Sequence, residues 1–336
     1  MSSEKPHPPP PTLIFEITSS VHPAFAFLAG AQLDLFSPLE QGPLTTEQLA
    51  KILEVNAPKL KPLLYALVAS QLLTVENDRF ANTEVANHYL VTNSPRFMGS
   101  MHELLSKMWE AELQTSASIR AGTPQAKHDY EIAPRDELAQ IFRGLHPGAI
   151  AAAYALLKRY DFSPYHTLLD VGGGSGGIAI TIAERHPQIE ATIIDLPSVT
   201  PIAQEFVDIS EAGGRIRIVA TDAVEESIDG SYDVAILRAF IQVLGPDEAR
   251  QALIHVGEAM NPGGHIYIIG AVLDDSRLSP RGTVAFNLLF LNIYDAGAAY
   301  TEQEYRDWLF ESDFENVERT LLPDGNSFIT AQKKHP

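Results

Sequence analysis

The sequence predicts an α/β protein in which a parallel sheet with helices on both faces follows a smaller, mainly helical domain. From residue 161 onward, short β-branched and aliphatic runs alternate with amphipathic stretches, and the first run ends in a cluster of glycines. Before residue 160, apolar residues recur at helical spacing and are interrupted by one short hairpin pattern. These observations indicate two domains of different architecture.

Bulk composition limits the classes of function. With 336 residues, 45% hydrophobic and 20% charged, the chain is long enough for two domains with their own cores. The absence of cysteine excludes disulfides, Cys-ligated zinc and thiol catalysis. A formal net charge of -19, with no Lys/Arg cluster to offset it, argues against a nucleic-acid partner. No stretch is apolar for long enough to span a bilayer, and none has the pattern of a leader, so we expect a cytoplasmic protein without a membrane partner.

The first 95 residues read as a tail followed by a helical domain. Residues 1–11 are rich in proline, so we expect a disordered tail. Within residues 12–95, Thr45 is placed to cap a helix that carries Gln48. The helical patterns cover residues 13–36 and 59–73, and strand-like runs at residues 73–75 and 79–81 flank a turn at Asn77-Asp78. This order is typical of a winged helix, and its weakly basic recognition segment favours dimerisation over DNA binding.

Residues 96–160 are predicted to form a helical linker that contributes to a substrate pocket. Met108 and Trp109 are candidate contacts to the substrate in this segment. His102 and Glu103 are adjacent, so on a helix they point about a third of a turn apart and make no ready metal pair. We therefore predict no metal site.

The glycine cluster marks a binding loop. The run Thr167–Val171 ends in Gly172-Gly173-Gly174-Ser175-Gly176-Gly177, and an apolar stretch with helical spacing follows. Glycines allow a ligand to approach the backbone, and the free amides at a helix start favour anionic or polar groups. The spacing from Gly172 to Gly176 fits an S-adenosylmethionine loop, and the spacing from Gly172 to Gly177 fits the dinucleotide fingerprint equally well.

Polar residues recur where the predicted strands end. Further strand-like runs lie at residues 191–195, 215–220, 232–237 and 265–269, with helices near residues 199–209 and 247–260. Asp170 ends the first strand, Asp195 ends the second, Asp222 follows the third and Arg238 follows the fourth. Ligands of parallel sheets bind beyond the carboxyl ends of the strands, so this recurrence indicates a site more strongly than helix capping does.

The carboxylates narrow the choice of ligand. Asp195 suits either ligand, because a carboxylate there can accept hydrogen bonds from ribose hydroxyls. Asp222 is placed to accept from an adenine amino group, and Asp170 is placed to receive an amino-acid ammonium. S-adenosylmethionine carries both groups, whereas a dinucleotide has no free ammonium.

Four motifs resemble those of class I S-adenosylmethionine-dependent O-methyltransferases of the caffeate and hydroxyindole type and of their microbial natural-product counterparts. They are Asp170–Gly176, Asp195-Leu196-Pro197, Thr221-Asp222 and Asn261–Gly264. The resemblance covers nearly the whole chain. It implies a Rossmann-like methyltransferase domain at residues 161–336, an N-terminal winged-helix dimerisation domain, and a homodimer.

The same resemblance implies roles for individual residues. Gly172, Gly174 and Gly176 would cradle the methionyl part of the cofactor. Asp195, with Leu196 beside it, would hold the ribose, and Asp222 and Ala223 would flank the adenine. Arg238 matches a Lys or Arg that the family places near the end of the cofactor.

Three departures from the family pattern concern catalysis. Gln242 stands where the family has a His general base, and the two supporting glutamates fall at Gly270 and Ala299. A carboxamide cannot take a proton at neutral pH. The joint loss of the base and of both carboxylates indicates different chemistry.

Three outcomes are open. The acceptor could be acidic enough to need no strong base, with Gln242 orienting it by a hydrogen bond. Another residue could act as the base, or the cofactor could be bound without methyl transfer and support a rearrangement, hydroxylation or pericyclic step. The candidate bases are His102, Glu103, His146, Tyr294 and Asp295.

Residues 280–296 are largely apolar and aromatic, and the resemblance makes them one wall of the acceptor pocket. Phe290 is a candidate contact in this wall. Asn287 and Asn292 are polar in an apolar run, and they need partners if they are buried. A helix at residues 301–312 and a hairpin of residues 316–322 and 328–332 complete the pattern.

Taken together, the sequence predicts a homodimeric S-adenosylmethionine-dependent methyltransferase of secondary metabolism. Its small-molecule acceptor is expected to be aromatic or polyketide-like and to be methylated on oxygen or carbon. The alternative is an enzyme of the same fold that binds the cofactor without transferring methyl. A winged-helix regulator and a dinucleotide oxidoreductase are the other classes left open.

Overall fold

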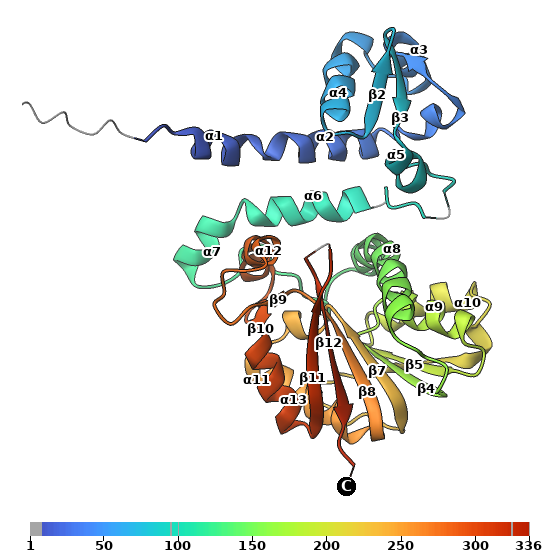
Figure 1. Ribbon diagram of the computed structural model, residues 1–336, viewed down its shortest axis with the longest axis vertical. Coiled ribbons are helices and arrows are strands. Elements are labelled where there is room, and N and C mark those ends of the chain that lie inside the picture. The colour runs from blue at the N-terminus through green and yellow to red at the C-terminus, as the bar shows by residue number, and fades with distance from the viewer. Residues whose placement is uncertain (1–8, 95, 100, 324, 336) are drawn as a thin grey trace, which may run out of the picture. The chain divides into compact units, whose positions relative to one another are not determined.

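The computed structural model describes residues 9–94, 96–99, 101–323 and 325–335. The chain divides into two compact units, Met1–Ser106 and Lys107–Pro336 (Figure 1). The first eight residues of the predicted tail lie outside the described residues. The predicted boundaries of a separate linker at residues 96–160 stay a prediction.

The first unit is mainly helical and contains one small sheet. Its elements are α1 (Thr12–Ser19), α2 (Val21–Gln32), the 3-10 turn η1 (Ser37–Gln41), β1 (Leu44–Thr45), α3 (Thr46–Ile52), α4 (Ala57–Ala69), β2 (Leu73–Glu76), β3 (Arg79–Asn82) and α5 (Glu84–Tyr89). The three strands are antiparallel in the order β1-β3-β2. The predicted succession of helices and a hairpin is therefore confirmed. Helix α6 (Met101–Glu112) crosses the boundary between the units.

Local sequence rules account for the helix starts in this unit. Thr45 Oγ1 accepts from the Gln48 amide at 3.3 Å, and Gln48 Oε1 accepts from the Thr45 amide at 2.9 Å. The predicted cap is thus a complete capping box. Leu49, Leu64 and Phe80 are fully buried in the core that α3, α4 and β3 share.

Helices α1 and α2 leave a large apolar surface exposed. Leu13, Ile14, Phe15 and Ile17 are 62% to 66% exposed. The helical run Thr12–Gln32 has 21 residues and is long and apolar enough to cross a membrane, by length and composition only. The expectation that no stretch reaches that length is therefore wrong by this criterion, although such a run near an N-terminus is weak evidence for a span.

The second unit is an α/β fold. Its elements are α7 (Thr115–Ala121), α8 (Arg135–Arg159), β4 (Thr167–Val171), α9 (Gly177–Arg185), β5 (Glu190–Asp195), α10 (Thr200–Asp208), η2 (Gly213–Arg215), β6 (Ile216–Ala220), β7 (Tyr232–Arg238), η3 (Ile241–Val243), α11 (Pro246–Glu258), β8 (Met260–Gly270), β9 (Val272–Leu273), α12 (Arg281–Ile293), β10 (Tyr300–Thr301), α13 (Glu302–Glu311), β11 (Phe314–Leu321) and β12 (Ser327–Lys333). The predicted strands and helices are all present, and the short pair β9 and β10 was not predicted.

Seven strands form the main sheet in the order β11-β12-β8-β7-β4-β5-β6. The five strands from β8 to β6 are parallel, and the hairpin β11 and β12 adds antiparallel strands at one edge. Figure 1 shows α11 and α13 on one face and α8, α9 and α10 on the other. This confirms the predicted parallel sheet covered on both sides.

Strand β7 shows why the sheet is buried on both faces. Ala235 and Leu237 point into the core beneath α11 and α13, whereas Val234 and Ile236 point into the core beneath α8 and α9. All four side chains are fully buried. A parallel strand covered by helices on both sides must be apolar along its whole length, and this one is.

Candidate functional site

The turn between β4 and α9 is shaped by three glycines with left-handed backbones. Gly172, Gly174 and Gly176 have φ values of +60°, +58° and +71°. A methyl group built at Gly172 would lie 2.5 Å from the ring of Phe240, and one at Gly174 would lie 2.8 Å from the ring of Phe142. Both backbone conformation and neighbouring rings therefore require glycine here.

Two carboxylates support this turn. Asp170, at the end of β4, accepts from the amide of Ala179 at 3.3 Å, and Asp195, at the end of β5, accepts from the amides of Gly174 at 2.7 Å and Leu196 at 2.8 Å. Desolvation by burial raises the pKa of Asp170 to about 7 and that of Asp195 to about 6. A cationic or hydroxyl-bearing ligand would favour the ionised forms of both groups.

Asp222, Ala223 and Arg238 lie at the same edge of the sheet. Asp222 follows β6, which pairs in parallel with β5, and its carboxylate accepts from the amide of Val224 at 2.8 Å. Ala223 is buried beside it. Arg238 ends β7, and its positive charge lowers the pKa of Asp170 and so partly offsets the effect of burial. The predicted polar residues therefore meet at the carboxyl ends of four neighbouring strands.

Two side-chain amides, one on η3 and one on α12, bond the backbone next to the short strands β9 and β10. Gln242 Oε1 accepts from the amide of Ala271 at 3.2 Å. Asn287 Oδ1 accepts from the amide of Ala299 at 2.7 Å. Both side chains are half-buried.

Aromatic side chains of α8, α12 and the segment before α8 line the same region. The hydroxyl groups of Tyr130 and Tyr294 lie 3.1 Å apart, and burial raises the pKa of both. The ring of Tyr294 also lies 5.9 Å from that of Phe290, between ring centres, and the ring of Tyr130 lies 6.0 Å from that of Phe142. Because Phe142 packs on Gly174, this aromatic cluster reaches the glycine turn.

The comparisons with known proteins agree with this geometry. Residues 120–315 match the model of an O-methyltransferase domain, and residues 16–92 match that of an O-methyltransferase dimerisation domain. The first match alone covers more than half of the chain.

The chain belongs to the O-methyltransferase family. It is an S-adenosylmethionine-dependent methyltransferase with an N-terminal dimerisation domain.

Similar proteins span nearly the same length. The 3-hydroxy-5-methyl-1-naphthoate 3-O-methyltransferase of Streptomyces sahachiroi is 26% identical over 335 residues, which cover 96% of this chain and 95% of the relative. The L-tyrosine C(3)-methyltransferase of Streptomyces lavendulae is 25% identical over 316 residues, which cover 89% of this chain and 86% of the relative. The solved structure of human N-acetylserotonin methyltransferase in complex with S-adenosylmethionine has a TM-score of 0.83 at 22% identity and covers 100% of both chains, and this likeness supports the fold.

The residues of this O-methyltransferase fit its cofactor. The glycine turn is a cradle that side chains would fill, as the contacts at Gly172 and Gly174 show. Asp170 would supply a carboxylate for an ammonium, and Asp195 would supply one for ribose hydroxyls. The individual assignments of these residues to parts of the cofactor stay predictions.

The other residues predicted for the methyltransferase site fall into different surroundings. Met108 packs with the apolar cluster around Phe290, and Trp109 follows it on α6. Asp295 is exposed and pairs with Lys127 at 2.6 Å. His102 lies in the first unit, where its ring bonds the carbonyl of Gly99 at 2.8 Å.

Asn292 is used by the packing of helices. Its Oδ1 accepts from Ser118 at 2.7 Å, and its Nδ2 donates to Thr115 at 3.0 Å and to the carbonyl of Leu288 at 2.8 Å. The side chain is fully buried. One N–H group of Asn292 therefore joins α7 to α12, and the other bonds within α12. The predicted contact of Asn292 with a substrate stays a prediction.

His146, a candidate base, lies against the glycine turn. Its Nδ1 is 2.8 Å from Ser175 Oγ, and its ring stacks on Phe206 with 4.0 Å between ring centres. Burial lowers the pKa of His146 to about 4, so the ring is neutral at pH 7. Through these contacts His146 helps to hold the glycine turn in its conformation.

The sequence analysis missed Tyr130, Phe142 and Phe240. Phe240 lies between two predicted site residues, Arg238 and Gln242, so its position in the chain could have indicated it. Tyr130 and Phe142 carry no such signal, because they reach the site from segments that precede the sheet.

Proposed function

We propose that this enzyme methylates an oxygen or a carbon of a small aromatic or polyketide-like natural-product intermediate, without a His general base. The observation that supports the cofactor side is the pair of carboxylates, Asp170 and Asp195, beside a turn that only glycines can form. The similarity to naphthoate and tyrosine methyltransferases of Streptomyces favours an aromatic acceptor, on oxygen or on carbon.

When bound, S-adenosylmethionine supplies a methyl group already activated by its sulfonium. The protein then has to position the acceptor for an in-line approach and to exclude water. The half-buried rings of Tyr130 and Tyr294, backed by the buried ring of Phe290, could pack against a flat acceptor. Gln242 would orient the acceptor through a hydrogen bond.

A second function is favoured by one specific observation. Gln242 stands in the position expected for the base, and its oxygen is bonded to the backbone of Ala271. An enzyme that binds the cofactor and uses its positive charge for a rearrangement, hydroxylation or pericyclic step needs no such base.

The deciding experiment measures binding and turnover separately. Calorimetric titration with S-adenosylmethionine and S-adenosylhomocysteine tests the cofactor site, and mass spectrometry of reactions with hydroxynaphthoates and hydroxyquinones tests methyl transfer. We expect a product heavier by one methylene group and an equal amount of S-adenosylhomocysteine. Substrate conversion with no loss of S-adenosylmethionine would establish the second function, and a protein that binds neither cofactor form would exclude both.

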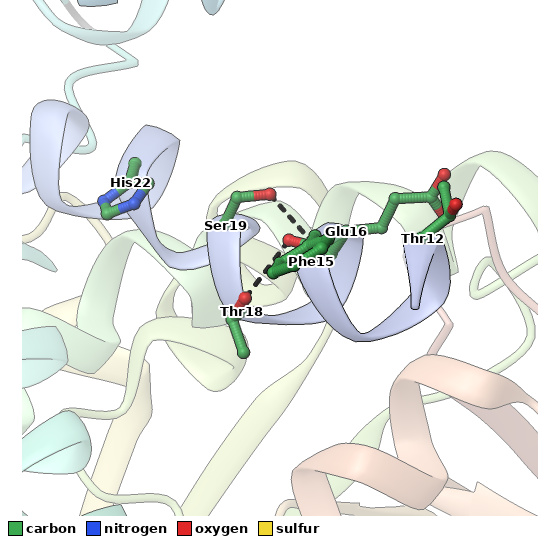
Figure 2. Close-up of a pocket in the computed structure, with 6 residues that line it drawn as sticks. All are labelled: Thr12, Phe15, Glu16, Thr18, Ser19 and His22. Carbon is green, nitrogen blue, oxygen red and sulfur yellow. Dashed lines mark hydrogen bonds between the residues drawn. The ribbon is translucent and has the colours of Figure 1, made fainter. Parts of the chain in front are cut away.

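We also propose that the protein is a homodimer, assembled through its N-terminal domain. The apolar side chains of α1 lie on an exposed helix, and Figure 2 shows the groove along it. The groove is lined by Thr12, Phe15, Glu16, Thr18, Ser19 and His22. The match of residues 16–92 to a dimerisation domain supports a second copy of this chain as the partner of this face. We include in this proposal a cytoplasmic location and no nucleic-acid or membrane partner.

Sedimentation velocity tests the dimer. We expect wild-type protein to sediment as a dimer and the double variant Phe15→Ser, Ile17→Ser to shift toward monomer. Thr18→Ser is the matched control on the same helix. Wild-type protein that stays monomeric at micromolar concentration, or that pellets with phosphatidylcholine vesicles through α1, would contradict the proposal.

A further inference from the structure

Gln242 and Asn287 are both held by their amide oxygens. A backbone N–H can only donate a hydrogen bond, so the atoms that accept from Ala271 and Ala299 must be the side-chain oxygens. The orientation of each amide is therefore determined by its partner. The NH₂ group of each, with its two donors, faces away from the backbone to which the oxygen is bonded.

The two anchoring N–H groups are neighbours. Ala271 directly precedes β9, and Ala299 directly precedes β10. These strands are parallel, with Val272 opposite Tyr300, so the two alanines stand at adjacent positions on neighbouring strands. Neighbouring strands lie about 4.8 Å apart. The structure thus anchors two oriented carboxamides at the starts of neighbouring strands.

A steric contact couples this arrangement to Gly270. A methyl group built at Gly270 would lie 2.8 Å from Gln242 Oε1. The Gln242 amide therefore occupies space that a side chain at position 270 would need. Ala299 is fully buried, so a longer side chain there has no room either.

The amide pair stands beside the cofactor edge. Phe240, two residues before Gln242, packs on Gly172 of the glycine turn, and the carbonyl of Gln242 lies 2.6 Å from a methyl group built at Gly297. The ring of Tyr294 lies 2.8 Å from the same built methyl group. Gln242 is therefore packed between the turn and the aromatic wall.

Ionisable groups also lie on the segments around the amide pair, and Arg238 ends the strand that precedes Gln242. On the segments packed around the pair they are Glu112, Asp274, Tyr294, Asp295 and Tyr300. Asp274 pairs with Arg319 at 2.7 Å, Asp295 pairs with Lys127, and the hydroxyl of Tyr300 donates to the carbonyl of Leu244 at 2.5 Å.

We propose that Gln242 and Asn287 form a two-donor site that holds the acceptor as an oxygen anion. The class of acceptor is an acidic phenol or enol, such as a hydroxyl conjugated with a carbonyl group. Its proton leaves to solvent on binding, so the protein has no proton to accept. This inference rests on the proposed function, because it describes how that acceptor is bound.

The physical reason is that donors aimed at an oxygen favour its ionised form. Two N–H bonds to an anion lower the pKa of the bound acceptor, and each bond to a charged group contributes more than a neutral one does. The charge disappears when the oxygen is methylated, so the donors stabilise bound acceptor more than the transition state. Their loss should raise KM and leave kcat unchanged or increase it.

The test uses 4-nitrophenol, whose anion absorbs visible light and whose neutral form does not. Protein saturated with S-adenosylhomocysteine is titrated with the probe at a pH where half of the free probe is ionised. We expect about nine-tenths or more of the bound probe to be the anion. The methylated analogue 4-nitroanisole has the same ring and nitro group but no ionisable oxygen, and it should bind at least about tenfold more weakly than the anion.

The variants Gln242→Glu and Asn287→Asp keep an oxygen for the backbone N–H and remove the NH₂ donors. We expect each to weaken binding of the anion by about tenfold to a hundredfold and to change 4-nitroanisole binding little. Gln242→Met removes the donors without adding charge and should reduce the preference for the anion in the same direction. Gln251→Glu, on the exposed face of α11, is the matched control for added charge.

The outcomes separate this inference from the proposed function. Wild-type protein that binds S-adenosylhomocysteine but shows no preference for the anion, or that holds neither probe, overturns the two-donor site and leaves the methyltransferase intact. Unchanged preference in all three variants overturns it as well. Failure to bind S-adenosylhomocysteine would remove the proposed function itself.

Discussion

Asp195 should make the affinity for S-adenosylhomocysteine depend on pH. Burial raises the pKa of this carboxyl to about 6 in the free protein. Ribose hydroxyls donate hydrogen bonds to the ionised form, so they lower that pKa in the complex. Below pH 6 the protein must therefore release a proton before it can bind, and the affinity must fall as the pH falls.

The size of the effect follows from the fraction ionised. A group with a pKa of 6 is about nine-tenths ionised at pH 7 and about one-tenth ionised at pH 5. The affinity should therefore fall about tenfold between these values, or about 1.4 kcal/mol. Asp170, with a pKa of about 7, adds a similar step at higher pH, so the clean measurement uses the Asp170→Asn variant.

Calorimetry in two buffers of different ionisation enthalpy measures the affinity and the protons released together. In Asp170→Asn we expect release of about one proton per ligand at pH 5 and almost none at pH 7.5. The double variant Asp170→Asn, Asp195→Asn should bind more weakly than Asp170→Asn, with no pH dependence in this range. An affinity of Asp170→Asn that is constant from pH 5 to 7, or that rises toward pH 5, would refute the reasoning.

Three further predictions concern the support of the site. Gly174→Ala forces a side chain into a left-handed backbone and against Phe142, so it should cost on the order of 1 to 2 kcal/mol of stability in thermal unfolding and weaken cofactor binding. Ser175→Ala removes the hydrogen bond to His146 and should cost about 1 kcal/mol in urea unfolding; an unchanged midpoint would contradict that contact. Asn292→Leu leaves the side chains of Ser118 and Thr115 without their hydrogen-bond partner. We therefore expect a loss of about 1 to 3 kcal/mol in the free energy of unfolding, measured in urea.

Much of the fold could be predicted because its signals are local. The capping box at Thr45 needs only residues three positions apart, and the glycine turn is a contiguous motif. The strand β7 is identified by its apolar run, because burial on both faces requires one. Polar residues that follow successive parallel strands must also meet at one edge, which brings Asp170 and Asp195 together.

The contacts that define the acceptor side could not be predicted in this way. Tyr130 and Tyr294 are 164 residues apart, and nothing local links them. The bond between Gln242 and Ala271 depends on how β9 follows β8, and the two-residue strand β9 has no recognisable pattern. Asn292 shows the converse, because a polar residue in an apolar helix can equally join two helices or face a ligand.

The contact between Gly270 and Gln242 restricts how the acceptor specificity of this enzyme can be changed. A carboxylate introduced at position 270 collides with the amide already there, and an imidazole introduced at position 242 finds no carboxylate to orient it. Each substitution alone should therefore reduce activity or stability, even if the two substitutions together are tolerated. Directed evolution by single steps would miss that route, and saturation libraries should vary both positions at once.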